Sequence, residues 1–269
     1  MNPPDLRLCR TILFLPASNP RAIEKARGLD ADMIILDLED AVKEEDKEGA
    51  REMAIEAAAA GFGERFCAIR MNAAGTLHYD EDVAAVRRSA ADVVILAKVE
   101  SARQTAEAAA ATGKPLLAMI ETSRAVLDAA AIAPATVGLI AGTNDLSAEL
   151  GIQPGGGRPG LAYALQQVVL AARAARVAAF DGVHNALDDE AGLAEECRQG
   201  RAYGFDGKSL IHPSQIEMAN RLFGPSEEEL AAAERLVAAA TGGAERFEGR
   251  MIEAMHVAQA RALLAKARR

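Results

Sequence analysis

Charged side chains stand at the ends of several apolar runs, where a buried strand has no need of charge. The stretch MIILDLEDAV (33–42) passes from four apolar residues to Asp37, Glu39 and Asp40. Later runs end in the same way, and the ionisable residues that end or follow them are Arg70, Lys98, Glu100, Glu121 and Asp145. Carboxylates gathered at one site repel one another unless cations neutralise them. Arg70 and Lys98 supply part of that positive charge, and a divalent cation could supply the rest.

Mg²⁺ is the cation that these residue types favour. The sequence has no pair of histidines at helical spacing and no cysteine cluster, which argues against zinc. An all-oxygen site with few protein carboxylates and open positions for substrate suits Mg²⁺. Glu121 and Asp145 are the ligands we expect, because they follow adjacent predicted strands. The alternative for Asp145 is a helix N-cap within TNDLSAEL.

The elements that must position these residues form a repeating β/α pattern. Eight apolar runs are predicted as strands: 11–17, 33–39, 66–72, 92–99, 115–122, 136–142, 176–183 and 205–211. Helices are predicted near 20–27, 46–60, 80–89, 101–112, 123–131, 161–175, 188–203 and 213–222. Apolar strands separated by helices indicate a parallel sheet covered by helices. Eight units in about 220 residues fit an α/β (β/α)₈ TIM barrel better than an open doubly wound sheet. No GxGxxG follows the first strand, which weakens the dinucleotide-binding alternative.

A barrel places its active site at the C-terminal ends of the strands, which is where the polar residues fall. Side chains of equal parity share one face of a strand. The pairs that should share a face are Asp37 with Glu39, Arg70 with Asn72, and Lys98 with Glu100. Asp181 and His184 follow the seventh strand and could assist catalysis at the rim, or could have a role in the loop. His212 follows the eighth strand and could transfer a proton, or could cap or order the turn that follows.

The C-terminal part of the chain is predicted as an appendage to the barrel. We expect a barrel domain at 1–223 and a helical extension at 224–269. The extension opens with GPSEEE, in which Ser226 and Glu229 are spaced for a capping box. Two helices should follow, broken at TGG (241–243). Within the barrel, QPGGGRPG (153–160) predicts a flexible loop.

Composition excludes several functional classes. A net charge of −9 argues against a broad nucleic-acid surface. The three scattered cysteines have no metal-binding spacing and favour reduced thiols in a cytoplasmic protein. The apolar start LCRTILFLPAS is too short to span a membrane and lacks a cleavage region, so neither a membrane anchor nor a signal peptide is expected.

Several stretches, in this order, carry a resemblance to a known family: RTILFLPASNPRAIEKA, DMIILDLEDAV, IRMN, LAKVE, MIET, GTNDLSAELG and GKSLIHPSQ. On these the chain resembles the citrate lyase β subunit and its relatives, in the superfamily of HpcH/HpaI aldolases and of malyl-CoA and citramalyl-CoA lyases. The resemblance implies a TIM barrel that is often trimeric or hexameric. It implies that Glu121 and Asp145 hold Mg²⁺ and that Arg70 binds the oxo or hydroxy acid. It also implies that Glu39 and Asp40 line the site and order the water shell of the metal.

The activity implied by this resemblance is reversible carbon–carbon cleavage of a β-hydroxyacyl-CoA to an acyl-CoA and a 2-oxo acid. The metal would chelate the substrate hydroxyl and adjacent carboxylate, and Arg70 would stabilise the oxygen that becomes the ketone. Further expected substrate contacts are Asp37, Lys98 and Gly142. Arg21 and Lys25 are candidates for the phosphates of CoA, with solvated helix charges as the alternative.

The chain departs from the resemblance in its tail. Many relatives have a C-terminal GxMID motif, whose Asp is assigned to a neighbouring subunit's site; here GRMIEAMHVAQA (249–260) has Glu253 at that position. Glu253 could transfer the proton that the released enolate needs, or could be a surface residue of a helix. Two other functions stay open: a metal-dependent aldolase acting on free 2-oxo acids without CoA, and a carboxylate-binding protein that has lost turnover. The Glu at position 253 is the only sequence support for the second of these.

Overall fold

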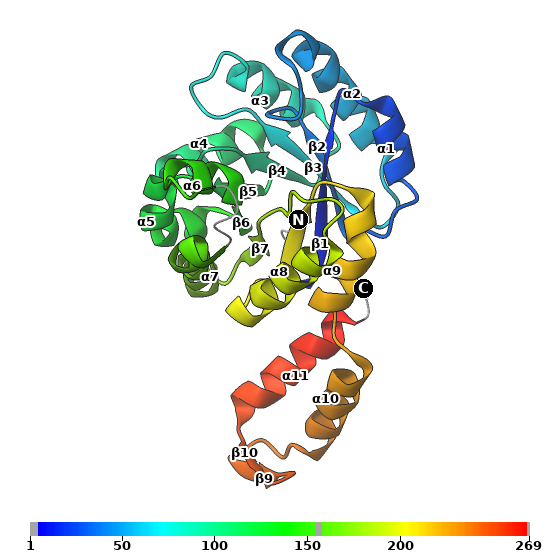
Figure 1. The fold of residues 1–269 in the computed structure, drawn as a ribbon, viewed down its shortest axis with the longest axis vertical. Coiled ribbons are helices and arrows are strands. Elements are labelled where there is room, and N and C mark those ends of the chain that lie inside the picture. Colours follow the sequence, from blue (N-terminus) through cyan, green and yellow to red (C-terminus); the bar gives the residue numbers. More distant parts are fainter. Residues whose placement is uncertain (1–4, 154–157, 268–269) are drawn as a thin grey trace.

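Eight parallel strands close into a barrel in chain order, which confirms the predicted fold (Figure 1). The computed structural model describes residues 5–153 and 158–267. The strands are β1 (Thr11–Pro16), β2 (Met33–Asp37), β3 (Phe66–Met71), β4 (Val93–Leu96), β5 (Leu116–Ile120), β6 (Gly138–Ala141), β7 (Ala178–Asp181) and β8 (Gly207–Leu210). β8 pairs with β1, so the barrel has no free edge.

Helices follow the strands and surround the barrel, as predicted. They are α1 (Pro20–Ala26), α2 (Lys47–Ala60), α3 (Tyr79–Arg88), α4 (Ala102–Thr112), α5 (Ser123–Ile132), α7 (Ala162–Ala175), α8 (Glu190–Tyr203) and α9 (Ile216–Phe223). An additional short helix, α6 (Thr143–Glu149), follows β6. Its N-cap is Gly142 and Asp145 lies in its first turn, so the alternative that Asp145 is an N-cap is wrong.

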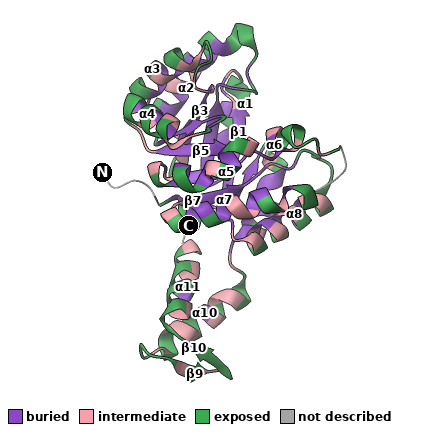
Figure 2. Ribbon diagram, turned by 90° about the vertical axis from the view of Figure 1, so that its left-hand side faces the viewer, coloured by how far each residue is buried: buried purple, intermediate pink, exposed green. Residues whose placement is uncertain are grey.

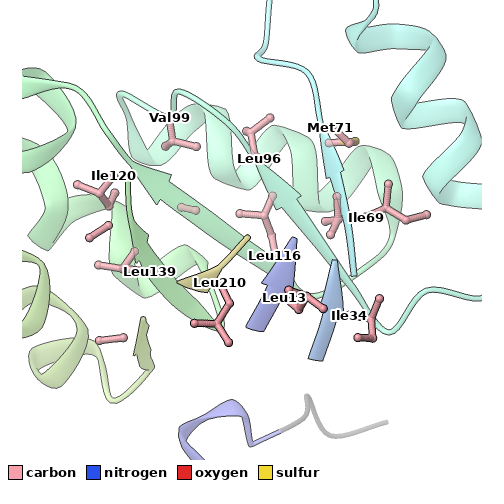
Figure 3. Packing of buried hydrophobic residues seen from close by; sticks show 14 of the residues in the cluster. Leu13, Ile34, Ile69, Met71, Leu96, Val99, Leu116, Ile120, Leu139 and Leu210 are labelled. Atoms are coloured by element: carbon pink, nitrogen blue, oxygen red, sulfur yellow. The ribbon is translucent and has the colours of Figure 1, made fainter. Parts of the chain in front are cut away.

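Alternating strand residues form two separate apolar clusters, as the period of two requires. One cluster lies between the strands and the helices and includes Leu13, Ile34 and Leu210 (Figure 3). The other fills the barrel interior and includes Ile12, Phe14 and Phe180. Buried strands are therefore enclosed by helices whose outer faces are exposed (Figure 2). This packing fixes the ends of the strands, and it therefore also fixes the positions of the polar residues that follow them.

The C-terminal residues form an arm that projects from the barrel (Figures 1 and 2). It consists of α10 (Glu227–Ala239), a hairpin of β9 (Glu245–Phe247) and β10 (Arg250–Ile252), and α11 (Ala254–Lys266). The predicted capping box of Ser226 and Glu229 is confirmed, as are two helices broken near 241–243. The hairpin was not predicted, because its strands are only three residues long and lack an apolar alternation.

Two further predictions concern loops and membranes. Residues 154–157, in the middle of the loop predicted to be flexible, lie outside the described residues, and the chain resumes in a 3₁₀ helix at Arg158–Leu161. Within 5–153 and 158–267, no helix combines the length and apolar character needed to cross a bilayer.

Candidate active site

A cavity of about 390 Å³ lies at the C-terminal ends of the strands, where a barrel active site is expected. Its wall combines apolar side chains of the barrel interior with charged residues of the loops. The lining residues used below are Phe14, Asp37, Asp40, Arg70, Glu121, Ile140, Gly142, Asp145 and Ser209. Six of the site candidates predicted from the sequence therefore meet at this one cavity: Asp37, Asp40, Arg70, Glu121, Gly142 and Asp145.

Arg70 is held at the cavity by Asp37, which lies directly opposite it on the neighbouring strand. The guanidinium donates from Nε and Nη2 to the two carboxylate oxygens, each at 2.6 Å. It also lies over the ring of Phe14, 5.0 Å from the centroid. Burial opposes the charge of Arg70, but the charge and hydrogen bonds of Asp37, together with the charges of Glu39 and Glu121, outweigh burial and raise the pKa of Arg70. Asp37 also accepts the backbone N–H groups of Glu39 and Ala41, so both its oxygens are occupied and it positions Arg70 and the β2 loop.

Glu39 links two cations at the wall of the site. Its Oε2 lies 3.0 Å from Nη1 of Arg70, and its Oε1 accepts a hydrogen bond of 2.6 Å from Nζ of Lys98. Burial raises the pKa of Glu39, although both cations act in the opposite direction. Asp40 is exposed at the rim, 3.6 Å from Nζ of Lys98. Lys98 is thus engaged with carboxylates of the protein rather than standing free for a substrate.

Lys47 and Asn72 support the loop after β2 without lining the cavity. Lys47 of α2, which the sequence analysis missed, donates to the carbonyls of Leu38 and Glu39 and fixes the loop after β2. Asn72 accepts a hydrogen bond from Lys47 and donates to Asp82, so it supports the loop from outside the described cavity lining. Glu100 is exposed and does not line the cavity.

Glu121 is a buried carboxylate immediately after β5, only 3% exposed. Its Oε1 accepts a hydrogen bond of 2.6 Å from the backbone N–H of Lys98, whose φ of +50° lies in the left-handed region. Burial raises the pKa of Glu121 to about 7, and the charges of Glu39 and Asp145 add to the rise. A buried carboxylate beside other carboxylates is a site that a cation would stabilise.

Asp145 lies in the first turn of α6, which follows the neighbouring strand β6. Its Oδ2 is 3.8 Å from Nζ of Lys98, and its side chain is about 42% exposed to the cavity mouth. Glu121 therefore binds the backbone N–H of Lys98, and Asp145 lies near the ammonium group of the same residue. Both line the same cavity, as the reasoning from adjacent strands predicted.

The donor set fits Mg²⁺ with two protein ligands. Within the described ranges, no three His, Cys, Asp or Glu side chains converge closely enough to enclose a metal by themselves. Two carboxylates with positions left for water and substrate are the usual protein share of a Mg²⁺ site. Five acidic side chains surround the region against Arg70 and Lys98, so it carries an excess of negative charge. The five are Asp37, Glu39, Asp40, Glu121 and Asp145.

Gly142 leaves the space that the carboxylate of Glu121 occupies. A Cβ at this position would lie 2.2 Å from Cβ of Glu121 and 2.5 Å from its Oε2. We therefore expect Gly142→Ala to displace Glu121 and weaken Mg²⁺ binding by about tenfold or more, the scale seen when support of a metal ligand is lost. Calorimetric titration with Mg²⁺ measures this, with Gly49→Ala as control because a Cβ there meets nothing within 4 Å. Equal affinities in Gly142→Ala and the unaltered protein would refute the packing argument.

A second charged network lies on the opposite face of β7 and β8. Nζ of Lys208 is fully buried and donates to Asp181 at 3.2 Å and to Glu196 at 3.0 Å. Arg158 donates to Asp181 at 2.7 Å, and Nδ1 of His184 lies 3.0 Å from Glu196. None of these five residues lines the cavity. The structure thus places Asp181 and His184 in a network that joins the barrel to α8.

The residues proposed for proton transfer from the tail (Glu253) and for binding CoA (Arg21 and Lys25) do not line the cavity. Glu253 caps the N-terminus of α11 with His256, next to β10 at the far end of the arm (Figure 1). Arg21 lines a separate surface hollow beside the cavity residue Ala41, together with Lys43. Lys25 is exposed on the next turn of α1. His212 caps the 3₁₀ helix Pro213–Gln215, which is the structural alternative to a catalytic role for this residue.

Ser209 is a cavity residue that the sequence analysis did not single out. It lies on β8 between Lys208 and Leu210 and is 1% exposed. One small polar residue in KSLI gives no signal of its own. Parity along β8 would have placed it on the inner face, but only if the boundaries of the strand had been known.

Two family models match the chain. The model described as HpcH/HpaI aldolase/citrate lyase matches residues 10–213. The model described as C-C_Bond_Lyase of the TIM-Barrel fold matches residues 158–269, which include the arm.

Curated relatives and solved structures are similar over nearly the whole chain. A (3S)-malyl-CoA thioesterase of Cereibacter sphaeroides is 43% identical, covering 96% of this chain and 94% of its own length. A citrate lyase subunit beta of Leuconostoc mesenteroides subsp. cremoris is 35% identical, covering 90% of this chain and 86% of its own. The crystal structure of CitE from Mycobacterium tuberculosis in complex with magnesium, acetoacetate and coenzyme A has a TM-score of 0.83 and 36% identity. It covers 98% of this chain and 100% of that chain.

Proposed function

The chain belongs to the HpcH/HpaI aldolase/citrate lyase family, and we propose that it is a Mg²⁺-dependent lyase that cleaves a β-hydroxyacyl-CoA of the malyl-CoA or citramalyl-CoA type. The products would be an acyl-CoA and a 2-oxo acid. One observation carries the proposal: Glu121, Asp145 and Arg70 converge on one cavity at the C-terminal ends of the strands. The CitE structure that holds magnesium, acetoacetate and coenzyme A supports it.

Bound between Glu121 and Asp145, Mg²⁺ would supply Lewis acidity toward the hydroxyl and carboxylate of the substrate. Arg70 has five N–H donors, of which two go to the oxygens of Asp37 and one, from Nη1, goes to Sδ of Met119 at 3.5 Å. The remaining donors can bind the oxygen that changes from hydroxyl to ketone. Because the two oxygens of Asp37 hold one edge of the guanidinium, this donor is oriented before the substrate arrives. Glu39 and Asp40 would accept hydrogen bonds from water in the site.

The bond changes balance without a nucleophile on the protein. The hydroxyl would give its proton to a water molecule held by Glu39 and Asp40, the carbon–carbon bond would break, and its electron pair would pass to the thioester as an enolate. Protonation of the enolate carbon gives the acyl-CoA. We assign that protonation to Glu253 of a neighbouring copy, because in its own chain this residue lies at the far end of the arm and lines no part of the cavity (Figure 1). This assignment requires a homo-oligomer, and the family resemblance implies a trimer or a hexamer.

The hollow that Arg21 and Lys43 line is where we place the phosphates of CoA. It adjoins the cavity through Pro16 and Ala41, which line both. Lys25 would add positive charge from the next turn of α1. Two cations at the edge of an acidic site would hold the anionic end of CoA away from the carboxylates.

Thioester hydrolysis is the second candidate, because the relative at 43% identity is named a (3S)-malyl-CoA thioesterase. The two reactions differ in their products. Incubating the protein with malyl-CoA or citramalyl-CoA and Mg²⁺ should yield acetyl-CoA with glyoxylate or pyruvate. Free CoA thiol and malate or citramalate would instead show hydrolysis. Citramalate lacking the thioester tests the aldolase alternative, and absence of every product at high enzyme concentration would leave the carboxylate-binding function.

Mg²⁺ affinity should depend on pH through Glu121. Its pKa of about 7 in the metal-free protein means that a proton competes with the metal below that value. From pH 8 down to pH 7 the affinity should change little, and below pH 7 it should fall by up to about tenfold per pH unit. Calorimetric titration with Mg²⁺ between pH 5.5 and 8.5 measures the profile. An affinity that stays constant down to pH 5.5 would show that Glu121 is not a ligand.

A further inference from the structure

Ser209 carries a buried hydroxyl for which the described residues provide no hydrogen-bond partner. The residue is 1% exposed, yet it lines the cavity that Glu121 and Asp145 also line. A hydroxyl buried without a partner destabilises the protein, so such groups are rare unless a bound molecule completes them. An unpaired hydroxyl in the wall of the catalytic cavity therefore points to a contact with substrate.

The direction of the Ser209 side chain follows from its neighbours on β8. Leu210 packs in the outer cluster with Leu13, and Lys208 bonds to residues on the outer face. Ser209 lies between them in sequence and so faces the barrel interior. Its partner on β1 is Ile12, which belongs to the interior cluster. Leu210 and Leu13, by contrast, belong to the outer cluster drawn in Figure 3. The hydroxyl thus sits in the apolar part of the wall, which Phe14 and Ile140 also form.

The charges around the cavity restrict what Ser209 can meet. Among the described residues that line it, Arg70 is the only cation, and Asp37 already holds that side chain from two nitrogens. The site has an excess of carboxylates, so a further carboxylate on the substrate would be repelled and would find no free cation. A neutral group that both gives and accepts a hydrogen bond is the partner that suits a hydroxyl.

We propose that Ser209 determines specificity for the substituent next to the ketone carbon, and that it favours a 2-oxo acid with a neutral hydroxyl there. The proposal rests on the function proposed above. In that function Mg²⁺ between Glu121 and Asp145 and the donors of Arg70 hold the carboxylate and the oxo oxygen of the acid. The thioester then extends toward the adjoining hollow in which the CoA phosphates were placed. The remaining substituent then faces the wall that carries Ser209. Hydroxypyruvate is the smallest probe of this class; pyruvate ends in a methyl group and oxaloacetate in a carboxylate.

The test is calorimetric binding of these three acids to the Mg²⁺-saturated protein and to Ser209→Ala. We expect the unaltered protein to bind hydroxypyruvate about five- to tenfold more tightly than pyruvate, and oxaloacetate most weakly. Ser209→Ala should lose the preference for hydroxypyruvate and keep its affinity for pyruvate within about twofold. Its melting temperature should not fall, because the substitution removes an unpaired buried hydroxyl.

Ser89→Ala is the matched control, since Ser89 is also buried but its hydroxyl donates to the carbonyl of Val86 at the end of α3. This variant should keep the full preference. The proposal is overturned if the unaltered protein shows no preference, if Ser209→Ala retains it, or if Ser209→Ala weakens all three acids equally. Failure of the unaltered protein to bind any of the three acids would overturn the proposed function, and this inference with it.

Discussion

Replacing Glu121 by Gln is expected to weaken Mg²⁺ binding by about 100-fold or more and to reduce turnover by a larger factor. Loss of a residue that merely supports a ligand costs about 10- to 100-fold in metal affinity, so loss of one of two protein ligands should reach the upper end or exceed it. Gln keeps the shape of the side chain and can still accept the backbone N–H of Lys98. What it removes is the charge that would bind the metal.

The same substitution should leave the metal-free protein folded. Burial raises the pKa of Glu121 to about 7, so holding this carboxylate ionised in the folded protein at pH 8 costs folding free energy, and a neutral Gln removes that cost. The melting temperature of metal-free Glu121→Gln at pH 8 should therefore equal or exceed that of the unaltered protein. Glu100→Gln is the control, an exposed carboxylate at the end of the adjacent β4 that lines no part of the cavity. A Glu121→Gln variant with unchanged Mg²⁺ affinity would eliminate this residue as a ligand.

Replacing Arg70 by Lys is expected to lower kcat by about 100- to 1000-fold, the range observed when one preorganised donor to a developing charge is removed. Lys keeps the positive charge but cannot bind both oxygens of Asp37 at once. The orientation of the donor is therefore lost while the charge balance with Asp37 and Glu39 is retained. Mg²⁺ affinity should change by much less than kcat, because neither predicted ligand depends on Arg70 for a hydrogen bond.

Arg87→Lys provides the comparison for this substitution, since Arg87 is exposed on α3 and outside the cavity. Its kinetics should match those of the unaltered protein. Steady-state rates measured at saturating Mg²⁺ separate the effect on kcat from any effect on metal binding. A value of kcat within about twofold of the unaltered protein would show that a positive charge alone suffices and that the fixed guanidinium has no catalytic role.

The barrel was predictable because its strands are continuous apolar runs and its helices are long and rich in alanine. Parallel strands all end at one rim, so the convergence of Glu121, Asp145 and Arg70 follows from the fold without any knowledge of side-chain geometry. Helix α6 and the β9–β10 hairpin escaped prediction because seven-residue and three-residue elements are too short for a clear period. Their formation depends on the contacts that the rest of the chain provides.

Side-chain partners could not be predicted from the sequence, because they depend on register. Asp37 was expected to contact substrate, whereas the pairing of β2 with β3 sets it opposite Arg70 and occupies both its oxygens. A shift of one residue would have left it free. Likewise, Lys98 was expected at the substrate, but the unusual backbone at this residue aims its amide at Glu121 and its ammonium at Glu39. Ser209 became visible only when the structure showed a buried hydroxyl with no partner.

The central claim is that one Mg²⁺ binds between the ends of β5 and β6. A crystal structure of the protein grown with Mg²⁺ and pyruvate tests it most directly. We predict a cation bound by Glu121 and Asp145 at about 2.0–2.1 Å from their oxygens, with pyruvate and water completing an octahedron. An active protein whose crystals hold no cation there, or hold the ammonium of Lys98 in its place, would contradict the account.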